Sequence, residues 1–470
     1  MARLFGPVAA PARLFFGLAL VAEHAGVRAL RLDACAAISS RVVRDNITLS
    51  DMLLENPREG KPHDKFEDGF AGNSRDLPWK GMWWRRVLES GKFAKVFAVE
   101  SNGTVPECPE VEWALKVSKS NDTDWFALKD ACVARALASM PDQAPAVLPV
   151  FDVRSNQGHV FVMSRRAKID LFEWERHCSN RLTSRLKKPW ADPTFIALKV
   201  ILFHQVLDGI QRMHALGNGN GVVHCDISPE NVMVRTDNYQ AFLIDFDAAR
   251  RVGNTIRMRA GKLDFMSPQY IEGKVCGRDT DIWAAGVTLY LLLIGDFPYT
   301  SGELANDDPA LKRIPSKTWA AQLLAAEQFA ARMKTDATWQ GGLRGRLDKM
   351  FTDFDAPDKR LRETYLQGFV GFPVAVFRML RSLFDVNATH RVEDFGNVVI
   401  DAARLANVSA GLVNLTWPVS ASAGAAAWAG GDVAQCAKAV QKMAKGEPHP
   451  VVQNIAGLEG LHRCLEDGDT

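Results

Sequence analysis

The sequence lacks long apolar runs and an excess of charge of either sign. No stretch of its 470 residues approaches the roughly 20 consecutive apolar side chains that a membrane-spanning helix needs. Its 57 Lys and Arg nearly balance 55 Asp and Glu, which leaves a formal net charge of +2. We therefore expect no membrane span in the mature protein, and neither nucleic acid nor an anionic membrane surface as a partner.

Closely spaced cysteine pairs are absent too. The eight cysteines are spread along the chain without a C-x-x-C pair, which argues against a zinc site of that type. Their even number permits disulfide bonds. We expect most of them to be ordinary buried residues, with one or two bridges among them.

The first 29 residues differ in kind from the rest. Arg3 and Arg13 precede an apolar run over 14–22, and small residues follow at Val27 and Ala29. This pattern predicts a secretory signal peptide, with an amphipathic organelle transit peptide as the alternative. Six of the eighteen asparagines begin an N-x-S/T glycosylation motif, where chance gives about two. They are Asn46, Asn102, Asn121, Asn387, Asn407 and Asn414. The excess favours the secretory pathway or secretion.

The most informative stretch runs from His224 to Asn231 and is followed, fourteen residues after Asn231, by Asp245. Pro229 marks the first segment as a loop. The short apolar runs 232–234 and 241–244 flank a turn and predict a hairpin that ends at Asp245. Asp226, Asn231 and Asp245 would then converge, and their oxygens suit a hard cation such as Mg²⁺.

These segments resemble the catalytic loop H-R-D-x-x-x-x-N and the D-F-G turn of protein kinases. The resemblance implies that Asp226 aligns the substrate hydroxyl and that Asn231 and Asp245 hold Mg²⁺. Upstream, 112–117 resembles V-A-I-K, so Lys116 would pair with the α- and β-phosphates of ATP. A helix predicted over 125–140 offers Asp130 as the acidic partner of Lys116, in a register where relatives carry Glu.

The glycine-rich hairpin of the family is matched poorly. Residues 87–99 resemble L-G-x-G-x-F-G-x-V, but only Gly91 remains, while Glu89 and Ala94 replace the other two glycines. A glutamate there would repel phosphates. The resemblance makes Met163 the gatekeeper and 164–167 the hinge. The nucleotide-binding residues that it implies are Gly91, Val96, Ala114, Lys116, Met163 and Ser164.

Several later segments extend the resemblance. Residues 261–269 look like the end of an activation segment, 281–286 match D-x-W-x-x-G, and Arg391 matches the arginine that pairs with the segment's last residue, here Gln269. Ser228 stands where Ser/Thr-specific relatives carry a lysine, and Lys262 stands where they carry a threonine. We therefore expect Lys262 to bring its ammonium to the transferring phosphoryl group, as a catalytic residue. A Lys262 side chain that points to solvent is the alternative.

The resemblance covers residues 83–405 and implies an α+β fold with two lobes, one a small antiparallel sheet with one helix and the other mainly helical. The expected parts are a signal peptide (1–29), an extension (30–80), the two lobes (81–166 and 167–407), with extra helices over 300–372, and a tail (408–470).

The implied function is ATP-dependent phosphorylation of Ser/Thr hydroxyls in protein substrates. A pseudokinase that keeps the fold without the chemistry is the alternative. A small-molecule phosphotransferase fits less well, because 267–269 and 281–286 build a protein-substrate groove.

Overall fold

The structure is a computed structural model of the chain. Its described residues are 42–43, 70–71, 77–91, 93–101, 113–120, 123–140, 146–167, 169–176, 193–219, 221–235, 239–255, 257, 260–299, 318–353, 359–412, 431–445, 448–449 and 457–466. The signal-like segment 1–29, the turn at 237–238 and the motifs that begin at Asn46, Asn102, Asn121 and Asn414 lie outside these residues.

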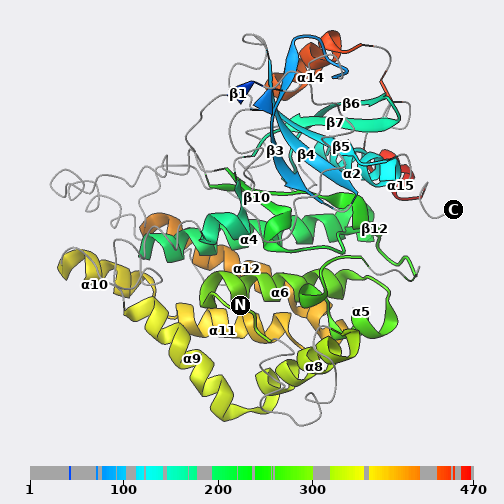
Figure 1. Ribbon diagram of the computed structural model, residues 1–470. Helices are drawn as coiled ribbons and strands as arrows, with labels where there is room; N and C mark the ends of the chain where they lie inside the picture. Colours follow the sequence, from blue (N-terminus) through cyan, green and yellow to red (C-terminus); the bar gives the residue numbers. More distant parts are fainter. Residues whose placement is uncertain are drawn as a thin grey trace, which may run out of the picture. The chain divides into compact units, whose positions relative to one another are not determined.

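A five-stranded antiparallel sheet, in the order β3-β4-β5-β7-β6, forms the sheet lobe (Figure 1). Its strands are β3 (Met82–Ser90), β4 (Ala94–Ser101), β5 (Trp113–Ser118), β6 (Val150–Asn156) and β7 (His159–Arg165). Alternation along β5 sends Trp113, Leu115 and Val117 into an apolar core. The same alternation turns Lys116 to the opposite face.

One helix of the sheet lobe, α2 (Asp124–Ala138), follows β5. It starts one residue before the predicted Trp125 and ends two before Met140. Alanine and other small side chains dominate its buried positions, so neighbouring elements can approach its backbone closely. The expected small antiparallel sheet with one helix between its strands is confirmed.

The second lobe is mainly helical, as expected. Its described helices are α4 (Pro193–Gly219), α5 (Pro268–Gly273), α6 (Arg278–Ile294), α8 (Trp319–Thr335), α9 (Ala337–Thr352), α10 (Lys359–Gly368), α11 (Phe372–Leu383) and α12 (Ala388–Leu412). A Cβ at Gly286 would lie 3.0 Å from Leu383 and 3.1 Å from Phe384, so glycine permits the close packing of α6 on this corner. The helices α8, α9 and α10 fill the described part of 300–372.

Short strands carry the segments between the lobes. β10 (Val232–Arg235) pairs antiparallel with β11 (Gln240–Leu243), and β8 (Ile169–Asp170) pairs with β10 on the other side. The predicted hairpin is therefore present. β9 (Val222–Val223) pairs with β12 (Arg250–Arg251), which joins the start of the catalytic loop to the segment after Asp245.

The two ends of the kinase-like region extend beyond the boundaries expected from the sequence. Leu77 and Trp79, placed in the extension, are fully buried in the sheet-lobe core. Helix α12 continues past 407 to Leu412. Two later helices, α14 (Gly431–Met443) and α15 (Gly457–Glu466), pack on β6 and α2 respectively. None of the described helices is both long and apolar enough to cross a membrane.

Disulfide bonds are a clear feature of the described chain. Cys132 is bonded to Cys464 and Cys225 to Cys276, with Cα atoms 5.6 and 5.9 Å apart. Cys436 is also disulfide-bonded. At least three bridges are therefore formed, which is more than the one or two expected from the sequence. The expectation that most of the eight cysteines are ordinary buried residues is corrected, because at least five of them are bonded.

Candidate active site

One buried carboxylate, that of Asp281, holds the start of the catalytic loop in place. Asp281, in the first turn of α6, is fully buried and accepts hydrogen bonds from the backbone N–H groups of His224 (2.8 Å) and Cys225 (2.9 Å). The ring nitrogen Nε2 of His214 lies 2.9 Å from the same carboxylate. Cys225 has a left-handed backbone with φ of 68°. The bonds to Asp281 hold this less common conformation and aim the next residue, Asp226, away from the core.

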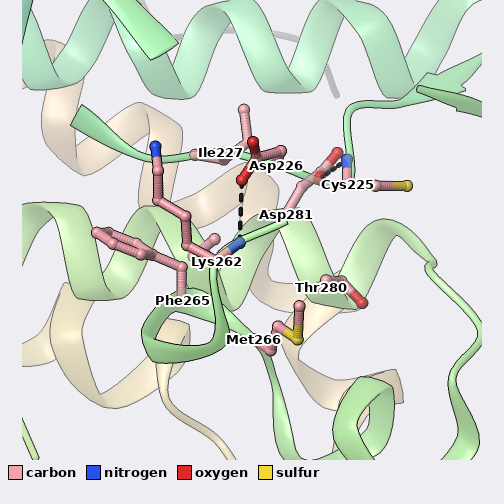
Figure 2. A pocket seen from close by; sticks show the side chains of 9 residues that line it. Cys225, Asp226, Ile227, Lys262, Phe265, Met266, Thr280 and Asp281 are labelled. Carbon is pink, nitrogen blue, oxygen red and sulfur yellow. Dashed lines mark hydrogen bonds between the residues drawn. The ribbon is translucent and has the colours of Figure 1, made fainter. Parts of the chain in front are cut away.

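Asp226 and Asn231 meet as the sequence predicts. The amide nitrogen of Asn231 donates to the main-chain oxygen of Asp226 at 2.7 Å and to its carboxylate at 2.9 Å. The backbone N–H of Lys262 donates to the other carboxylate oxygen of Asp226 at 3.2 Å (Figure 2). A Cβ at Gly261, whose φ is +86°, would lie 2.6 Å from the Cys225 carbonyl oxygen. Only glycine therefore lets this segment approach the loop and hold Asp226.

Lys116 is paired with two carboxylates from distant parts of the chain. Its ammonium lies 2.6 Å from Asp130 Oδ2 on α2 and 2.7 Å from Asp245 Oδ1. The other oxygen of Asp130 accepts the N–H of Phe246 at 2.8 Å. Asp130 therefore joins strand β5 to the turn that contains Asp245. Although Asp is one methylene shorter than Glu, helix α2 is close enough for both contacts.

The electrostatics favour the charged forms of Lys116 and Asp245. Burial opposes the charge on Lys116, but Asp130 and Asp245 outweigh it and hold the Lys116 pKa well above its usual value. Burial raises the pKa of Asp245, but the charge and hydrogen bond of Lys116 bring it below the usual value. Burial, followed by the charge of Asp245, raises the pKa of Asp247 to about 7. Sequence reasoning missed Asp247 as part of the site, although it stands in the family's glycine position.

The donor set fits Mg²⁺. Asn231 uses its amide nitrogen to hold Asp226, which leaves its amide oxygen as a ligand. Asp245 uses Oδ1 for Lys116 and has a second carboxylate oxygen. Mg²⁺ is commonly held by one or two protein oxygens together with waters and substrate phosphates. Among the described residues, no group of three or more His, Cys, Asp or Glu side chains forms a complete metal cage.

Lys262 places a second ammonium beside the catalytic loop. Its Nζ donates to Ser228 Oγ at 2.7 Å and lies 3.4 Å from Glu230 Oε2. The Lys262 side chain is 39% exposed, so the ammonium remains accessible. Figure 2 shows this side chain extending back toward the catalytic loop, beside a small cavity of about 10 Å³ next to Asp226. The residue therefore approaches the position of Ser228, as the exchange of residue types predicts.

Strand register decides which residues face Lys116. Glu89 pairs with Val96 and Val96 with Lys116, so these three side chains share one face of the sheet. Ala114 and Ser164 are paired on that face as well. Val96, Ala114 and Ser164 are thus on the face predicted for nucleotide contact. The Glu89 side chain is exposed, yet partial desolvation, followed by the charge of Asp245, raises its pKa, so this carboxyl lies within the field of the site.

Met163 and Gly91 are the other two residues predicted to contact the nucleotide. Met163 pairs with Leu115, is fully buried and belongs to the apolar core, so it lies on the face opposite to Lys116. The gatekeeper assignment of Met163 is therefore corrected, because a shift of one residue along a strand reverses the face. Val162, opposite Lys116, takes the site-facing position. Gly91 is at the exposed β3–β4 turn, where its carbonyl oxygen accepts a hydrogen bond from the Lys119 ammonium.

The end of the activation-like segment is anchored as expected. Arg391 donates to Gln269 Oε1 at 2.7 Å, which is the pairing that the resemblance implies. Because the Gln269 amide carries no charge, this contact is a hydrogen bond and not a salt bridge. The arginine is fully buried, and Asp279 lies 3.3 Å from the same nitrogen. Asp279 therefore supplies the negative charge that Gln269 lacks, a compensation that the sequence pattern did not reveal.

Asp170 provides a test of the electrostatics near the site. Its Oδ1 accepts the N–H of Glu173 at 2.8 Å, and burial raises its pKa to about 6. Because this value exceeds the unfolded value of about 3.9, the folded protein binds more protons, and stability falls as pH rises from about 4 to about 6. Asp170→Asn should remove this dependence.

After a discount for partial solvent exposure, the unfolding free energy of the parent should fall by about 1 kcal/mol relative to Asp170→Asn between pH 4 and pH 8. Denaturant titrations of both proteins at the two pH values measure the difference. An equal difference at both values would show that Asp170 titrates normally.

Comparisons with known proteins agree with the geometry. The family model for the protein kinase domain matches residues 86–340. Smooth muscle myosin light chain kinase of Gallus gallus is 33% identical over 118 residues, covering 24% of this chain and 6% of that protein. The serine/threonine-protein kinase dkf-2 of Caenorhabditis briggsae is 27% identical over 168 residues, covering 35% and 13%. A carbon catabolite-derepressing protein kinase of Secale cereale is 25% identical over 256 residues, covering 54% and 46%.

Each match spans less than half the length of the curated relative. The family model, in contrast, covers more than half of this chain and includes Lys116, Asp130, Asp226, Asn231 and Asp245. Asp130 and Asp245 are bonded to Lys116. Asn231 is bonded to Asp226, whose pKa is also affected by the charge of Asp245. The chain belongs to the protein kinase domain family.

Proposed function

We propose that the protein is an ATP-dependent protein kinase that transfers the γ-phosphoryl group of Mg-ATP to Ser or Thr hydroxyls of protein substrates. The observation that carries the proposal is the double pairing of Lys116 with Asp130 and Asp245 at 2.6 and 2.7 Å. It assembles a fixed cation and a fixed carboxylate from three separate segments. The names of relatives such as the serine/threonine-protein kinase dkf-2 support the choice of substrate hydroxyl.

Each residue has a distinct task in this proposal. Lys116 binds the nucleotide phosphates, and Asp130 holds Lys116 in position. Asn231 and Asp245 would hold Mg²⁺, which neutralises phosphate charge when bound. Asp226, whose pKa is raised by burial against the opposing charge of Lys262, orients the incoming hydroxyl and accepts its proton. Val96, Ala114 and Ser164 line the face on which the nucleotide would lie.

Lys262 is assigned to the transferring phosphoryl group. Its backbone N–H holds Asp226 and its ammonium reaches Ser228, so one residue both positions the base and supplies charge. Lys262→Ala should lower kcat at least about 10²-fold, because the backbone bond remains while the charge on the transition state is lost. Steady-state kinetics on a protein substrate measure this.

The second change in the Lys262 test is a rescue. Adding Ser228→Lys to Lys262→Ala should restore part of kcat, since the new ammonium starts from the residue that Lys262 now contacts. Equal kcat for Lys262→Ala and the parent would remove Lys262 from the mechanism.

Glu89 favours a second candidate function, that of a pseudokinase. Its carboxyl shares the face of Lys116 and stands two strands away in the same row. Phosphates entering this space would meet a negative charge where the family has glycine. A protein that kept the fold but bound nucleotide too weakly for transfer would be a binding module, and the same assay separates the two functions.

The test of the proposed function is transfer of label from γ-labelled ATP to a generic protein substrate in the presence of Mg²⁺, with Asp245→Asn as the control. Transfer by the parent that disappears in the control supports the kinase. No transfer by a folded parent protein supports the pseudokinase.

We also propose that the protein resides in the secretory pathway or is secreted. Supporting this are the disulfides Cys132–Cys464 and Cys225–Cys276, because such bonds persist mainly in oxidising compartments. Asn387 and Asn407 begin glycosylation motifs and are exposed. Treatment of protein from its native host with an N-glycosidase should increase its electrophoretic mobility. Unchanged mobility would count against this location.

A further inference from the structure

The C-terminal segment forms part of the sheet lobe. Cys436 and Val440 of α14 are buried in the same apolar core as the sheet residues Trp84 and Phe151. Backbone hydrogen bonds run from Lys445 to Pro78 (2.7 Å) and from Lys80 to Met443 (2.9 Å). The N–H of His449 donates to Val153 of β6 at 3.1 Å. The segment therefore lies along the sheet as an integral part of this lobe.

After this segment, helix α15 reaches α2 (Figure 1). Leu461, Cys464 and Leu465 are buried, and Cys464 is bonded to Cys132 of α2. The bridge joins residues 332 positions apart in the sequence. Helix α15 also contacts β12, the strand that follows the Asp245 turn. Helix α15 thus contacts α2, which carries Asp130, and the strand that follows the Asp245 turn.

The positions of Asp130 and Cys132 on α2 place the helix between two attachments. Two residues along an α-helix correspond to a rotation of about 200°, so the two side chains leave from nearly opposite sides. Asp130 joins one side to Lys116 and to the N–H of Phe246. Cys132 joins the other side to α15. Movement of α2 away from β5 would therefore have to carry α15 with it.

Building on the proposed function, we propose that α15 is a positioning element for the nucleotide site. Through the Cys132–Cys464 disulfide it keeps α2 close to β5, so that the short Asp130 side chain stays bonded to Lys116. Cys132 and Cys464 are positioning residues that act through Asp130. Without the bridge, α2 moves more freely, Lys116 loses its fixed orientation and Mg-ATP binds more weakly.

The variant Cys132→Ala/Cys464→Ala of the full chain tests the proposal, with Cys225→Ala/Cys276→Ala as a control that removes a different bridge. Hydrogen exchange of the α2 amides, which needs no phosphoryl transfer, should become at least about tenfold faster in the first variant only. Unchanged exchange in α2, or equal acceleration in the control, would overturn the proposal.

A second readout separates positioning from general stabilisation. The Kd for Mg-ATP should rise at least about fivefold when the Cys132–Cys464 bridge is removed from the parent. Removal from an Asp130→Asn protein should change Kd less than about twofold, because the bridge acts through Asp130. Equal factors in both backgrounds would mean that the bridge stabilises the lobe generally, and would overturn the assignment to Asp130.

The proposal can still be tested if Mg-ATP does not bind or if the variant does not fold. If neither parent nor variant binds Mg-ATP, the proposed function fails, while α2 exchange still decides whether α15 holds the helix. If the variant does not fold, peptide mapping of the unreduced parent decides, since a peptide pair joining Cys132 and Cys464 is required and its absence overturns the proposal.

Discussion

Asp245→Asn should lower phosphoryl transfer by about 10³-fold while leaving the protein folded. Asn has nearly the shape of Asp but carries no charge. The substitution therefore weakens two contacts together: the 2.7 Å ion pair with Lys116 and the carboxylate oxygen assigned to Mg²⁺. Since Lys116 holds the Asp245 pKa below its usual value, the carboxylate is ionised at neutral pH, and that charge is what the variant loses.

The rate is measured as kcat with saturating protein substrate and Mg-ATP, and folding by thermal unfolding. Asp208→Asn is the matched control, because Asp208 is also in an ion pair, 2.6 Å from Arg212 on the same helix α4. The control should keep kcat within about twofold, since isolated i,i+4 pairs contribute little. Transfer by Asp245→Asn at the parent rate would exclude Asp245 from the chemistry.

Asp281→Ala should have the largest effect on stability. The substitution leaves the backbone N–H groups of His224 and Cys225 buried without their acceptor and removes the partner of His214. Loss of a fully buried, multiply bonded carboxylate should reduce the free energy of unfolding by about 3–5 kcal/mol. The catalytic loop should lose its conformation at the same time, because these bonds hold the left-handed backbone of Cys225.

Denaturant titration measures this loss, and Asp401→Ala provides the comparison. Asp401 lies 2.6 Å from Arg378, whose side chain is 62% exposed, so the control should lose less than about 1 kcal/mol. A loss for Asp281→Ala no greater than that of the control would show that other contacts fix the loop.

The chemical residues of the site could be predicted from the sequence because their positions depend on short segments. Asp226, Asn231 and Asp245 belong to one loop and one hairpin, where spacing and apolar runs restrict the geometry strongly. Asp130 followed from the helix register together with the resemblance to protein kinases, which carry Glu at that position. The bonds of Asp130 and Asp245 to Lys116, and of Asn231 to Asp226, agree with that expectation.

Other features depend on contacts between distant segments, which the local sequence pattern does not determine. Met163 and Val162 are neighbours, and only the pairing of β5 with β7 decides which of them faces Lys116. The pairing of Cys132 with Cys464 joins segments 332 residues apart, and eight cysteines permit 105 complete pairings. The attachment of α14 and α15 to the sheet lobe could not be predicted. Their sequences indicate amphipathic helices, but an apolar face does not identify the surface on which it packs.

The most direct test of the proposed kinase activity compares nucleotide binding with phosphoryl transfer in the parent and in Asp226→Asn. Asp226 contacts Asn231 and the Lys262 backbone and stands apart from the Lys116 group. We predict that both proteins bind Mg-ATP with Kd values within about threefold, and that Asp226→Asn transfers the phosphoryl group at least about 10²-fold more slowly in a single turnover. A parent protein that binds Mg-ATP but transfers no faster than Asp226→Asn would contradict the proposed phosphoryl transfer.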